Sequence, residues 1–235
     1  MKEVWKPIQI DLICGVGIND ADYLVEIREE LPRDVVTGKR KRKYIWQCPF
    51  YSKWKNMIWR CYSAKQYPTY EECSVVTEWL TFSKFKSWME QQDWEGNQLD
   101  KDILVKDNKT YGPNTCVFVS KRINTFMNDC RAAGNGLGIG VHFNKQAGKF
   151  QARCRSADGT KRKHLGYFDN PKEANLAWLT YKLEQAKILA SEQKDIRVAK
   201  ALVDHYSNWE LFEFALKETT SHLTNKTLDS FPNNV

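Results

Sequence analysis

Three features that define large protein classes are missing from this sequence. No apolar stretch approaches the roughly 18 residues that cross a bilayer, so we expect no transmembrane helix. Residues 1–6 lack the apolar segment of a secretory signal, which predicts a cytoplasmic protein. The seven cysteines are odd in number and form no C-x-x-C pair, a pattern typical of reduced, buried thiols rather than of a disulfide framework.

The sequence also lacks a standard metal-binding pattern and contains few histidines. Cys48, Cys61, Cys73 and Cys116 are separated by 13, 12 and 43 residues, which matches no standard zinc pattern. A structural zinc ion is therefore the weaker interpretation and buried thiols the stronger. The chain has 4 histidines, and the first of them is His142. This excludes a catalytic or metal-binding imidazole from the part of the chain that precedes it.

Positive charge is present and is unevenly placed. The 235 residues carry a net charge of +7, and 42% of them are apolar, enough for the core of one large domain or two small ones. Residues 139–168 alone contain seven basic residues and one acidic residue. Such concentrated positive charge is typical of proteins that bind polyanions. A second basic run, residues 39–43, is better explained as a solvated surface face.

The N-terminal half mixes strands and helices. Residues 1–52 are irregular and β-rich, with a strand predicted at residues 44–46. Two segments with apolar residues at helical spacing follow, at residues 54–62 and 81–91. Residues 131–138 include three glycines, which predicts a linker between two domains.

Beyond this linker the sequence predicts a three-stranded antiparallel sheet covered by a helix. Alternation with a period of two predicts strands at residues 140–144, 149–155 and 161–167. Asn170 as N-cap and Pro171 at the first helical position predict the start of the covering helix. One or two further helices are expected within residues 195–217, followed by a polar tail.

The alternation also assigns the two faces of this sheet. In the middle strand Phe150, Ala152 and Cys154 share one face, and Lys149, Gln151, Arg153 and Arg155 share the other. The apolar face requires the helix, and the basic face is left for a partner. A row of arginines on such a sheet suits the DNA major groove, where guanidinium groups read guanine and lysines contact phosphates.

Gly140-Val141, residues 148–152 and residues 165–169, followed by Glu173-Ala174, match a known domain in glycine, strand and helix spacing. Over about 50 residues the chain resembles the Apetala/ethylene-response-factor DNA-binding domain. In that family exposed sheet residues contact DNA. The resemblance therefore implies a set of DNA-contacting residues: His142, Asn144, Lys149, Gln151, Arg153, Arg155, Arg162 and His164. The family usually has arginine and tryptophan in place of Asn144 and His164, which leaves the base preference open.

A second motif lies upstream, at residues 99–102, residues 111–116 and Asn124. The spacing predicts a strand, a loop, a second strand and a helix for which Ser120 is the N-cap. Together with residues 57–61, Glu78-Trp79-Leu80 and the aromatic residues after them, these segments resemble the ββα-metal core of His-Asn-His nucleases of the phage homing type.

The nuclease resemblance implies roles for individual residues. Asp100 and Asn124 match two ligands of a divalent metal, Mg²⁺ or Mn²⁺, which holds the scissile phosphate. Thr115 stands where the family has its middle asparagine, and Lys101 stands where the family has the histidine that serves as general base.

Replacement of the histidine by Lys101 leaves three interpretations. Burial and a nearby metal ion lower the pKa of Lys101 enough for it to act as the base. Alternatively, Asp102 on the same strand orients or deprotonates the water. In the third interpretation the site is inactive and the fold only binds DNA, because a lysine with an ordinary pKa of about 10.4 is a poor base.

The sequence thus predicts an α+β protein with a nuclease-like core, a sheet packed on a helix, and C-terminal helices. The predicted parts are a β-rich region (1–52), a nuclease domain (53–130), a linker (131–138), a DNA-binding domain (139–192) and C-terminal helices with a tail (193–235). We expect a metal-dependent DNA endonuclease in the cytoplasm of a bacterial host. Its partner is double-stranded DNA, with no membrane and no small-molecule cofactor. The alternatives are a non-catalytic, sequence-specific DNA-binding protein and, less favoured, an RNA-binding or host-interaction protein.

Overall fold

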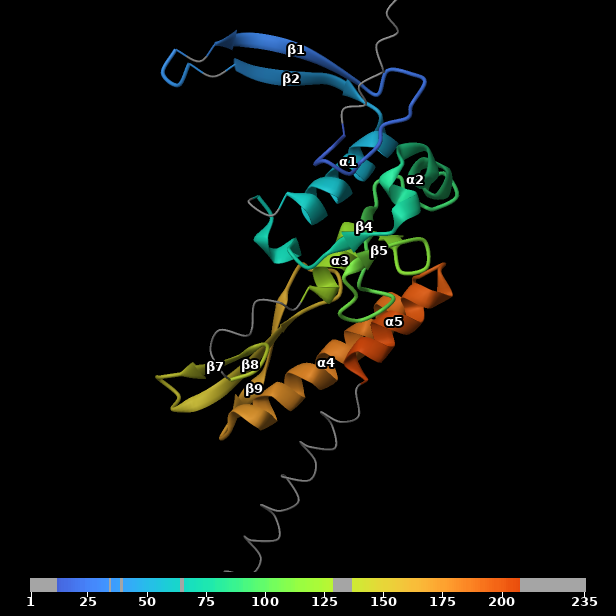
Figure 1. Cartoon of the computed structure of the whole chain (residues 1–235). Helices are drawn as coiled ribbons and strands as arrows, with labels where there is room; N and C mark the ends of the chain where they lie inside the picture. Colours follow the sequence, from blue (N-terminus) through green and yellow to red (C-terminus); the bar gives the residue numbers. More distant parts are fainter. Residues whose placement is uncertain (1–11, 34, 39, 64–65, 129–136, 208–235) are drawn as a thin grey trace, which may run out of the picture. The chain divides into compact units, whose positions relative to one another are not determined.

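The computed structural model describes residues 12–33, 35–38, 40–63, 66–128 and 137–207. It divides the chain into two compact units, Met1–Val119 and Ser120–Val235, here called the N-terminal and C-terminal units. Both units combine helices with small sheets, so the predicted α+β class is confirmed (Figure 1). Within the described ranges, no helix has the length and apolar character that would let it cross a membrane.

Short elements make up the N-terminal unit. In chain order they are β1 (Glu26–Arg33), β2 (Arg40–Gln47), α1 (Pro49–Tyr62), β3 (Ser74–Val75), α2 (Phe82–Met89), β4 (Gln98–Asp100), β5 (Thr110–Tyr111) and β6 (Val117–Val119), with 3-10 helices at Pro68–Tyr70 and Thr77–Leu80. The two predicted helices are therefore confirmed. Helix α1 begins earlier than predicted, at Pro49, because the fixed φ of proline suits the first helical turn.

The core of this unit is built around α1. Trp54, Met57, Ile58 and Cys61 follow the helical spacing, and all four are buried. The indole Nε1 of Trp54 donates a hydrogen bond to the Trp79 carbonyl oxygen at 2.7 Å, so the polar edge of this fully buried ring is satisfied. Residues of the predicted β-rich region, among them Val25 and Cys48, pack in the same core.

Strands β1 and β2 form an antiparallel hairpin (Figure 1). Acidic residues of β1 lie opposite basic residues of β2: Glu29 pairs with Lys43, and Glu30 lies 3.7 Å from the Arg42 guanidinium. The charge of the basic run is thus partly balanced within the hairpin. For Arg42 and Lys43, this pairing supports the interpretation of the run as a solvated surface face.

The second predicted motif is present in part: its first strand ends at Asp100, residues 113–115 form a turn instead of a strand, and the strand that pairs with β4 is β6. Strand β4 pairs antiparallel with β6, with Asp100 opposite Val117. Helix α3 (Lys121–Met127) follows β6 directly, and the Ser120 hydroxyl accepts a hydrogen bond from the Ile123 amide, which confirms the predicted cap. Strand β5 instead pairs in parallel with β3, which the sequence did not indicate.

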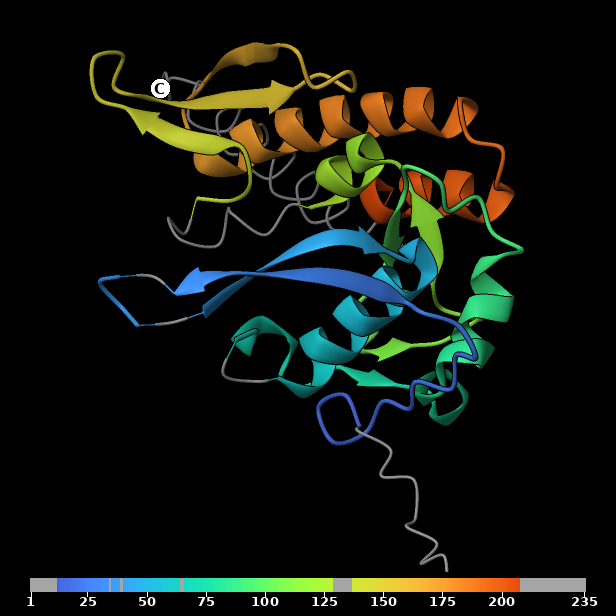
Figure 2. The ribbon, with the colours of Figure 1, turned by 90° about the horizontal axis from the view of Figure 1, so that it is seen from above.

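The C-terminal unit contains the predicted sheet. Its elements after α3 are β7 (Val141–Asn144), β8 (Lys149–Arg155), β9 (Arg162–Phe168), α4 (Pro171–Ser191) and α5 (Ile196–Tyr206). The strands form an antiparallel sheet in the order β7-β8-β9, and α4 lies along one face of it (Figures 1 and 2). Asn170 caps α4 by accepting a hydrogen bond from the Glu173 amide at 2.8 Å, as predicted.

Gly140 fixes the spacing between this sheet and α4. Its φ is +75°, and a Cβ at this position would lie 2.0 Å from Cδ1 of Trp178 on α4. A left-handed backbone and an indole packed against the main chain both require glycine here. Val141, Ala152 and Ala174 complete the buried layer between sheet and helix.

Helix α3 belongs to the C-terminal unit. The carbonyl oxygen of Phe126, at the end of α3, accepts hydrogen bonds from Lys182 Nζ on α4 (2.7 Å) and from the Tyr206 hydroxyl on α5 (3.2 Å). Arg122 also bonds to the Ala157 carbonyl and to Glu192. The boundary between units therefore falls at residue 119 rather than at 130, because these contacts tie α3 to helices that are distant in sequence.

Two predictions concern segments for which no structure is given. Most of the predicted linker, residues 131–136, lies outside the described residues. The same holds for the part of the predicted C-terminal helices and tail that follows residue 207.

Candidate nucleic-acid interface

The face of the β7-β8-β9 sheet that points away from α4 carries the predicted DNA-contacting residues. Its register places them in four rows across the strands: Asn144 with Lys149, His142 with Gln151 and Tyr167, Arg153 with His164, and Arg155 with Arg162. A register shift between Ala152 and Arg153 keeps the arginines and His164 on this outer face. The predicted side of the sheet is therefore correct for all eight residues.

Two arginines face each other across the sheet. Arg155 and Arg162 are directly opposite in the register of β8 and β9, and like charges at such positions destabilise a sheet. Among the described residues, neither these two nor Arg153 has an acidic partner. The arrangement therefore carries an electrostatic cost in the free protein.

The nearby carboxylates are occupied elsewhere. Asp169 pairs with Lys149, with 3.1 Å between Nζ and Oδ1. Asp158 accepts hydrogen bonds from the Ser156 hydroxyl and from the amide and hydroxyl of Thr160, which together lower its pKa to about 2. Both acidic groups therefore leave the charge of the arginine rows uncompensated.

Gln151 was predicted to be an exposed contact residue, but the structure buries it. It lies on the predicted face, but its side chain is only 1% exposed. Alternation assigns a side chain to a face and does not reveal how far its neighbours cover it. Its Oε1 is buried and has no hydrogen-bond partner within the described part of the chain.

Tyr167 is an exposed residue of this face that the sequence did not single out. Its side chain is 47% exposed, its ring lies 4.8 Å from that of His164, and its hydroxyl accepts a hydrogen bond from Asn144 Nδ2 at 3.4 Å. Simple alternation from His164 would place Tyr167 on the opposite face. The extra residue that the register shift introduces returns Tyr167 to the outer face.

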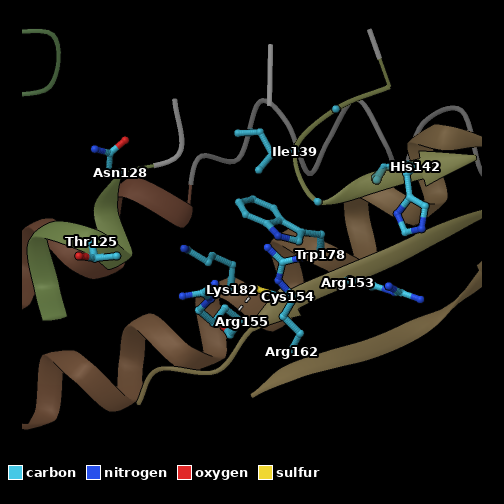
Figure 3. Close-up of a pocket in the computed structure, with 13 residues that line it drawn as sticks. Thr125, Asn128, Ile139, His142, Arg153, Cys154, Arg155, Arg162, Trp178 and Lys182 are labelled. Atoms are coloured by element: carbon cyan, nitrogen blue, oxygen red, sulfur yellow. Dashed lines mark hydrogen bonds between the residues drawn. The ribbon is translucent and has the colours of Figure 1, made fainter. Parts of the chain in front are cut away.

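A pocket of about 620 Å³ opens beside the arginine rows. It lies where β8 continues past the start of β7, at the point where the Arg153 amide donates to the Gly140 carbonyl at 2.9 Å. Figure 3 shows Arg155 and Arg162 lining this pocket together with Trp178 and Lys182 of α4. Positive charge thus extends from the sheet face around the end of β8.

The predicted catalytic residues form a tight turn after β4. Asp100 Oδ1 accepts hydrogen bonds from the amides of Asp102 and Ile103, both at 2.9 Å. Burial, and then the neighbouring carboxyl group of Asp102, raise the pKa of Asp100 to about 6. The site therefore holds two carboxyl groups close enough for one to hinder ionisation of the other.

Lys101 is held by two acceptors that favour its charged form. Its buried Nζ donates to Asp102 Oδ2 and to the Asn108 carbonyl oxygen, both at 3.0 Å. Burial favours the neutral amine, but the hydrogen bond and charge of Asp102 outweigh it and raise the pKa of Lys101. These two acceptors favour the charged amine, whereas the interpretation with a lowered lysine pKa also requires a nearby metal ion and stays a prediction.

Asp102 is the partner that keeps Lys101 charged. Burial alone would raise the pKa of Asp102, but its hydrogen bonds with Asp100 and Lys101 outweigh burial and lower it. Asn108 completes the turn, because its Nδ2 donates to the carbonyls of Lys101 and Thr110, both at 2.7 Å. Asn108 was missed by the sequence analysis. Its position after Asp107, which has a φ of +60°, is the turn signal that could have identified it.

The other two predicted site residues, Thr115 and Asn124, lie outside this turn. The Thr115 hydroxyl donates to the carbonyls of Thr110 (2.9 Å) and Gly112 (3.3 Å), so it holds the loop before β6. Asn124 lies on α3 and is half-buried. Asp100 and Asn124 belong to different units, and the metal site that they would share stays a prediction.

Four cysteines of the N-terminal unit are buried in its core: Cys48, Cys61, Cys73 and Cys116. Burial, before any other influence, raises the pKa values of Cys61 and Cys116 to about 12, so both thiols stay protonated. Within the described residues, no group of three or more His, Cys, Asp or Glu side chains is arranged to hold a metal ion. The ligand set predicted from the sequence also includes an asparagine, Asn124.

The chain was compared with known proteins at three levels. No protein-family model, curated protein or solved structure matches it. The assignment of function therefore depends on the geometry of the two sites.

Proposed function

We propose that the protein binds double-stranded DNA through the outer face of the β7-β8-β9 sheet. The observation that carries this proposal is a set of guanidinium groups with no acidic partner among the described residues, with Arg155 opposite Arg162 and Arg153 in the adjacent row. Phosphate groups would relieve the repulsion between them, and guanidinium groups that enter the major groove can bond to guanine O6 and N7.

The shape of this face favours a duplex over a single strand. Single-strand binding surfaces stack successive bases on several exposed aromatic rings. The outer face offers Tyr167, whose ring is already beside His164, and no row of further rings among its described residues. Strands with projecting arginines can instead enter the major groove.

Fluorescence anisotropy of the full chain with labelled duplex DNA tests this proposal. We expect affinity to fall steeply with salt, with a slope of log K against log salt of about −0.9 for each phosphate contact. Arg155→Ala and Arg162→Ala should each lose affinity, by about 1–3 kcal/mol if the side chain reads a base.

Lys200→Ala serves as the matched control. Lys200 is an exposed cation of the same unit that pairs with Asp204 on α5, away from the sheet. Its loss should leave affinity unchanged. Equal losses in all three variants, or a salt-independent affinity, would contradict a specific role for the sheet.

We further propose, as a second function, divalent-metal-dependent cleavage of DNA at the Asp100 turn. The supporting observation is the pair of carboxyl groups, Asp100 and Asp102, held together by the turn. Carboxylate oxygens are the ligands that Mg²⁺ and Mn²⁺ prefer, and a bound cation would offset the burial and the repulsion from Asp102 that raise the pKa of Asp100.

In this proposal each residue of the turn has a separate role. Asp100, with Asn124 from α3, would hold a metal ion that supplies charge stabilisation to the scissile phosphate. Asp102 orients the attacking water, and the protonated Lys101 contacts a phosphate oxygen. This differs from the sequence-based role of Lys101 as a base, because its bonds to Asp102 and Asn108 keep it charged.

Plasmid nicking with Mg²⁺ or Mn²⁺ separates an enzyme from a DNA-binding protein. We expect Asp100→Ala and Asp102→Asn to abolish nicking and Lys101→Ala to weaken it, with duplex affinity intact in all three. Mg²⁺ should also raise the thermal midpoint of wild type more than that of Asp100→Ala, because a ligand that binds the folded state stabilises it. If wild type and Asp100→Ala nick equally, the protein is a non-catalytic DNA-binding protein.

A further inference from the structure

Gln151 has a buried polar atom without a hydrogen-bond partner in the described part of the chain. It occupies the centre of the middle strand β8, and its side chain is 1% exposed. Its Oε1 accepts no hydrogen bond from any described residue. A buried acceptor without a donor destabilises a fold, and most such groups in proteins are satisfied.

The position of Gln151 places this acceptor just beneath the proposed DNA-binding face. The register puts Gln151 between His142 on β7 and Tyr167 on β9, and both of these neighbours are exposed. Helix α4 covers the opposite face of the sheet, where Val141 and Ala152 pack against Ala174. A single layer of side chains therefore separates the amide of Gln151 from a partner that lies on the outer face.

We infer that Gln151 is a specificity-determining residue that reads an adenine in the major groove. This inference rests on the proposed DNA-binding function. When long side chains of the outer face extend toward the phosphates and bases, the amide beneath them is uncovered. Its Oε1 then accepts a hydrogen bond from the adenine N6 amino group, while Nε2 donates to N7.

Gln151 and the neighbouring arginines differ in charge, and we expect them to contribute differently to DNA binding. Arg153, Arg155 and Arg162 supply charge, which attracts any DNA sequence. Gln151 is neutral, lies at the centre of the sheet and contains both an acceptor and a donor, the combination that matches adenine. Replacing it should therefore change which sequence is bound rather than how strongly DNA in general is bound.

The test is selection of bound duplexes from a randomised pool by the full-length protein, followed by affinity measurements on the selected site and its single-base variants. Wild type should show one position with a strong adenine preference. Gln151→Met keeps the length of the side chain and removes both polar groups, so it should lose about 5- to 150-fold of discrimination at that position. Its salt dependence should stay near that of wild type, and its thermal midpoint should be equal or higher because the unsatisfied acceptor is removed.

Gln151→Glu provides a second variant with a directional outcome. A carboxylate can only accept, so the preference at the same position should move from adenine to cytosine, whose N4 amino group is a donor. Gln146→Met is the matched control, because Gln146 is an exposed residue of the β7–β8 turn. It should leave the selected sequence unchanged.

The outcomes separate the two proposals. Wild-type specificity retained by Gln151→Met overturns this inference and leaves DNA binding by the sheet in place. A uniform loss of affinity for all sequences with a lowered thermal midpoint also overturns it, because that result marks Gln151 as purely structural. Absence of duplex binding by wild type overturns the proposed function and this inference with it.

Discussion

At the scale of single residues, folding brings the carboxyl groups of Asp100 and Asp102 into one turn, where they cannot both ionise freely. Asp100 has its pKa raised to about 6, while that of Asp102 is lowered. The turn is nevertheless held by Asp100 itself, which accepts two backbone hydrogen bonds. One side chain therefore stabilises the local backbone and carries an electrostatic cost at neutral pH.

This conflict gives a pH-dependent stability. Because burial and Asp102 raise the folded-state pKa of Asp100 from 3.8 to about 6, its contribution is favourable at low pH and is lost as pH rises through about 6. Asp100→Asn keeps the Oδ1 acceptor and removes the charge. We expect this variant to raise the thermal midpoint at pH 7.5 and to raise it less, or not at all, at pH 4.5. Calorimetry at both pH values checks this, and a gain that is the same at both would contradict it.

Some residue environments could be predicted from the sequence and others could not. The outward position of Arg153, Arg155 and Arg162 follows from local alternation, which a strand imposes on every residue. The burial of Gln151 depends on the size and direction of side chains on two other strands. The charge of Lys101 depends on the Asn108 carbonyl, which the chain brings back only after a loop.

At the scale of elements, local signals were reliable where they were complete. Helix α4 has an N-cap, a first-turn proline and an acidic residue in its first turn, so its start was predicted at the correct residue. Strands β7 to β9 have alternation and turn residues. The two-residue strands β3 and β5 have too few residues to show a period, and their pairing joins segments far apart in sequence.

Gly140 and Gly148 allow a matched test of element packing. Both have positive φ, +75° and +64°, but a Cβ at Gly148 would meet no atom within 4 Å, whereas at Gly140 it would overlap Trp178. We expect Gly148→Ala to cost about 1–2 kcal/mol from backbone strain and Gly140→Ala about 2–5 kcal/mol from strain plus overpacking. Urea unfolding measures both values. Equal costs would show that Trp178 moves aside freely.

At the scale of the whole molecule, the limits of the C-terminal unit are set by contacts that no local pattern reports. Helix α3 joins it through Phe126, whose carbonyl oxygen binds Lys182 and Tyr206. Helix α5 joins it through the buried side chains of Leu202 and Tyr206. The sequence-based domain, residues 139–192, omits both helices.

Two fragments test this boundary. A fragment of residues 139–192 loses the burial of Val198, Leu202 and Tyr206, worth about 1.5–3 kcal/mol for each fully buried side chain, against a total stability of about 5–15 kcal/mol for a domain. We expect residues 120–207 to unfold cooperatively and 139–192 to be partly folded at 25 °C. Circular dichroism melts and amide NMR dispersion distinguish them. Equal melting midpoints would mean that α3 and α5 add nothing to the fold.

The buried thiols give each unit its own chemical reporter. Cys48, Cys61, Cys73 and Cys116 are buried in the N-terminal unit, and Cys154 is buried in the C-terminal unit. Only a thiolate reacts with an alkylating reagent, and Cys61 and Cys116 form one rarely while they are buried. Alkylation therefore proceeds through transient opening, at a rate that reflects its free energy. Mass spectrometry identifies the cysteines that are labelled and the rate at which each is labelled. These rates would give the opening free energy of each unit separately in the intact chain, with and without DNA.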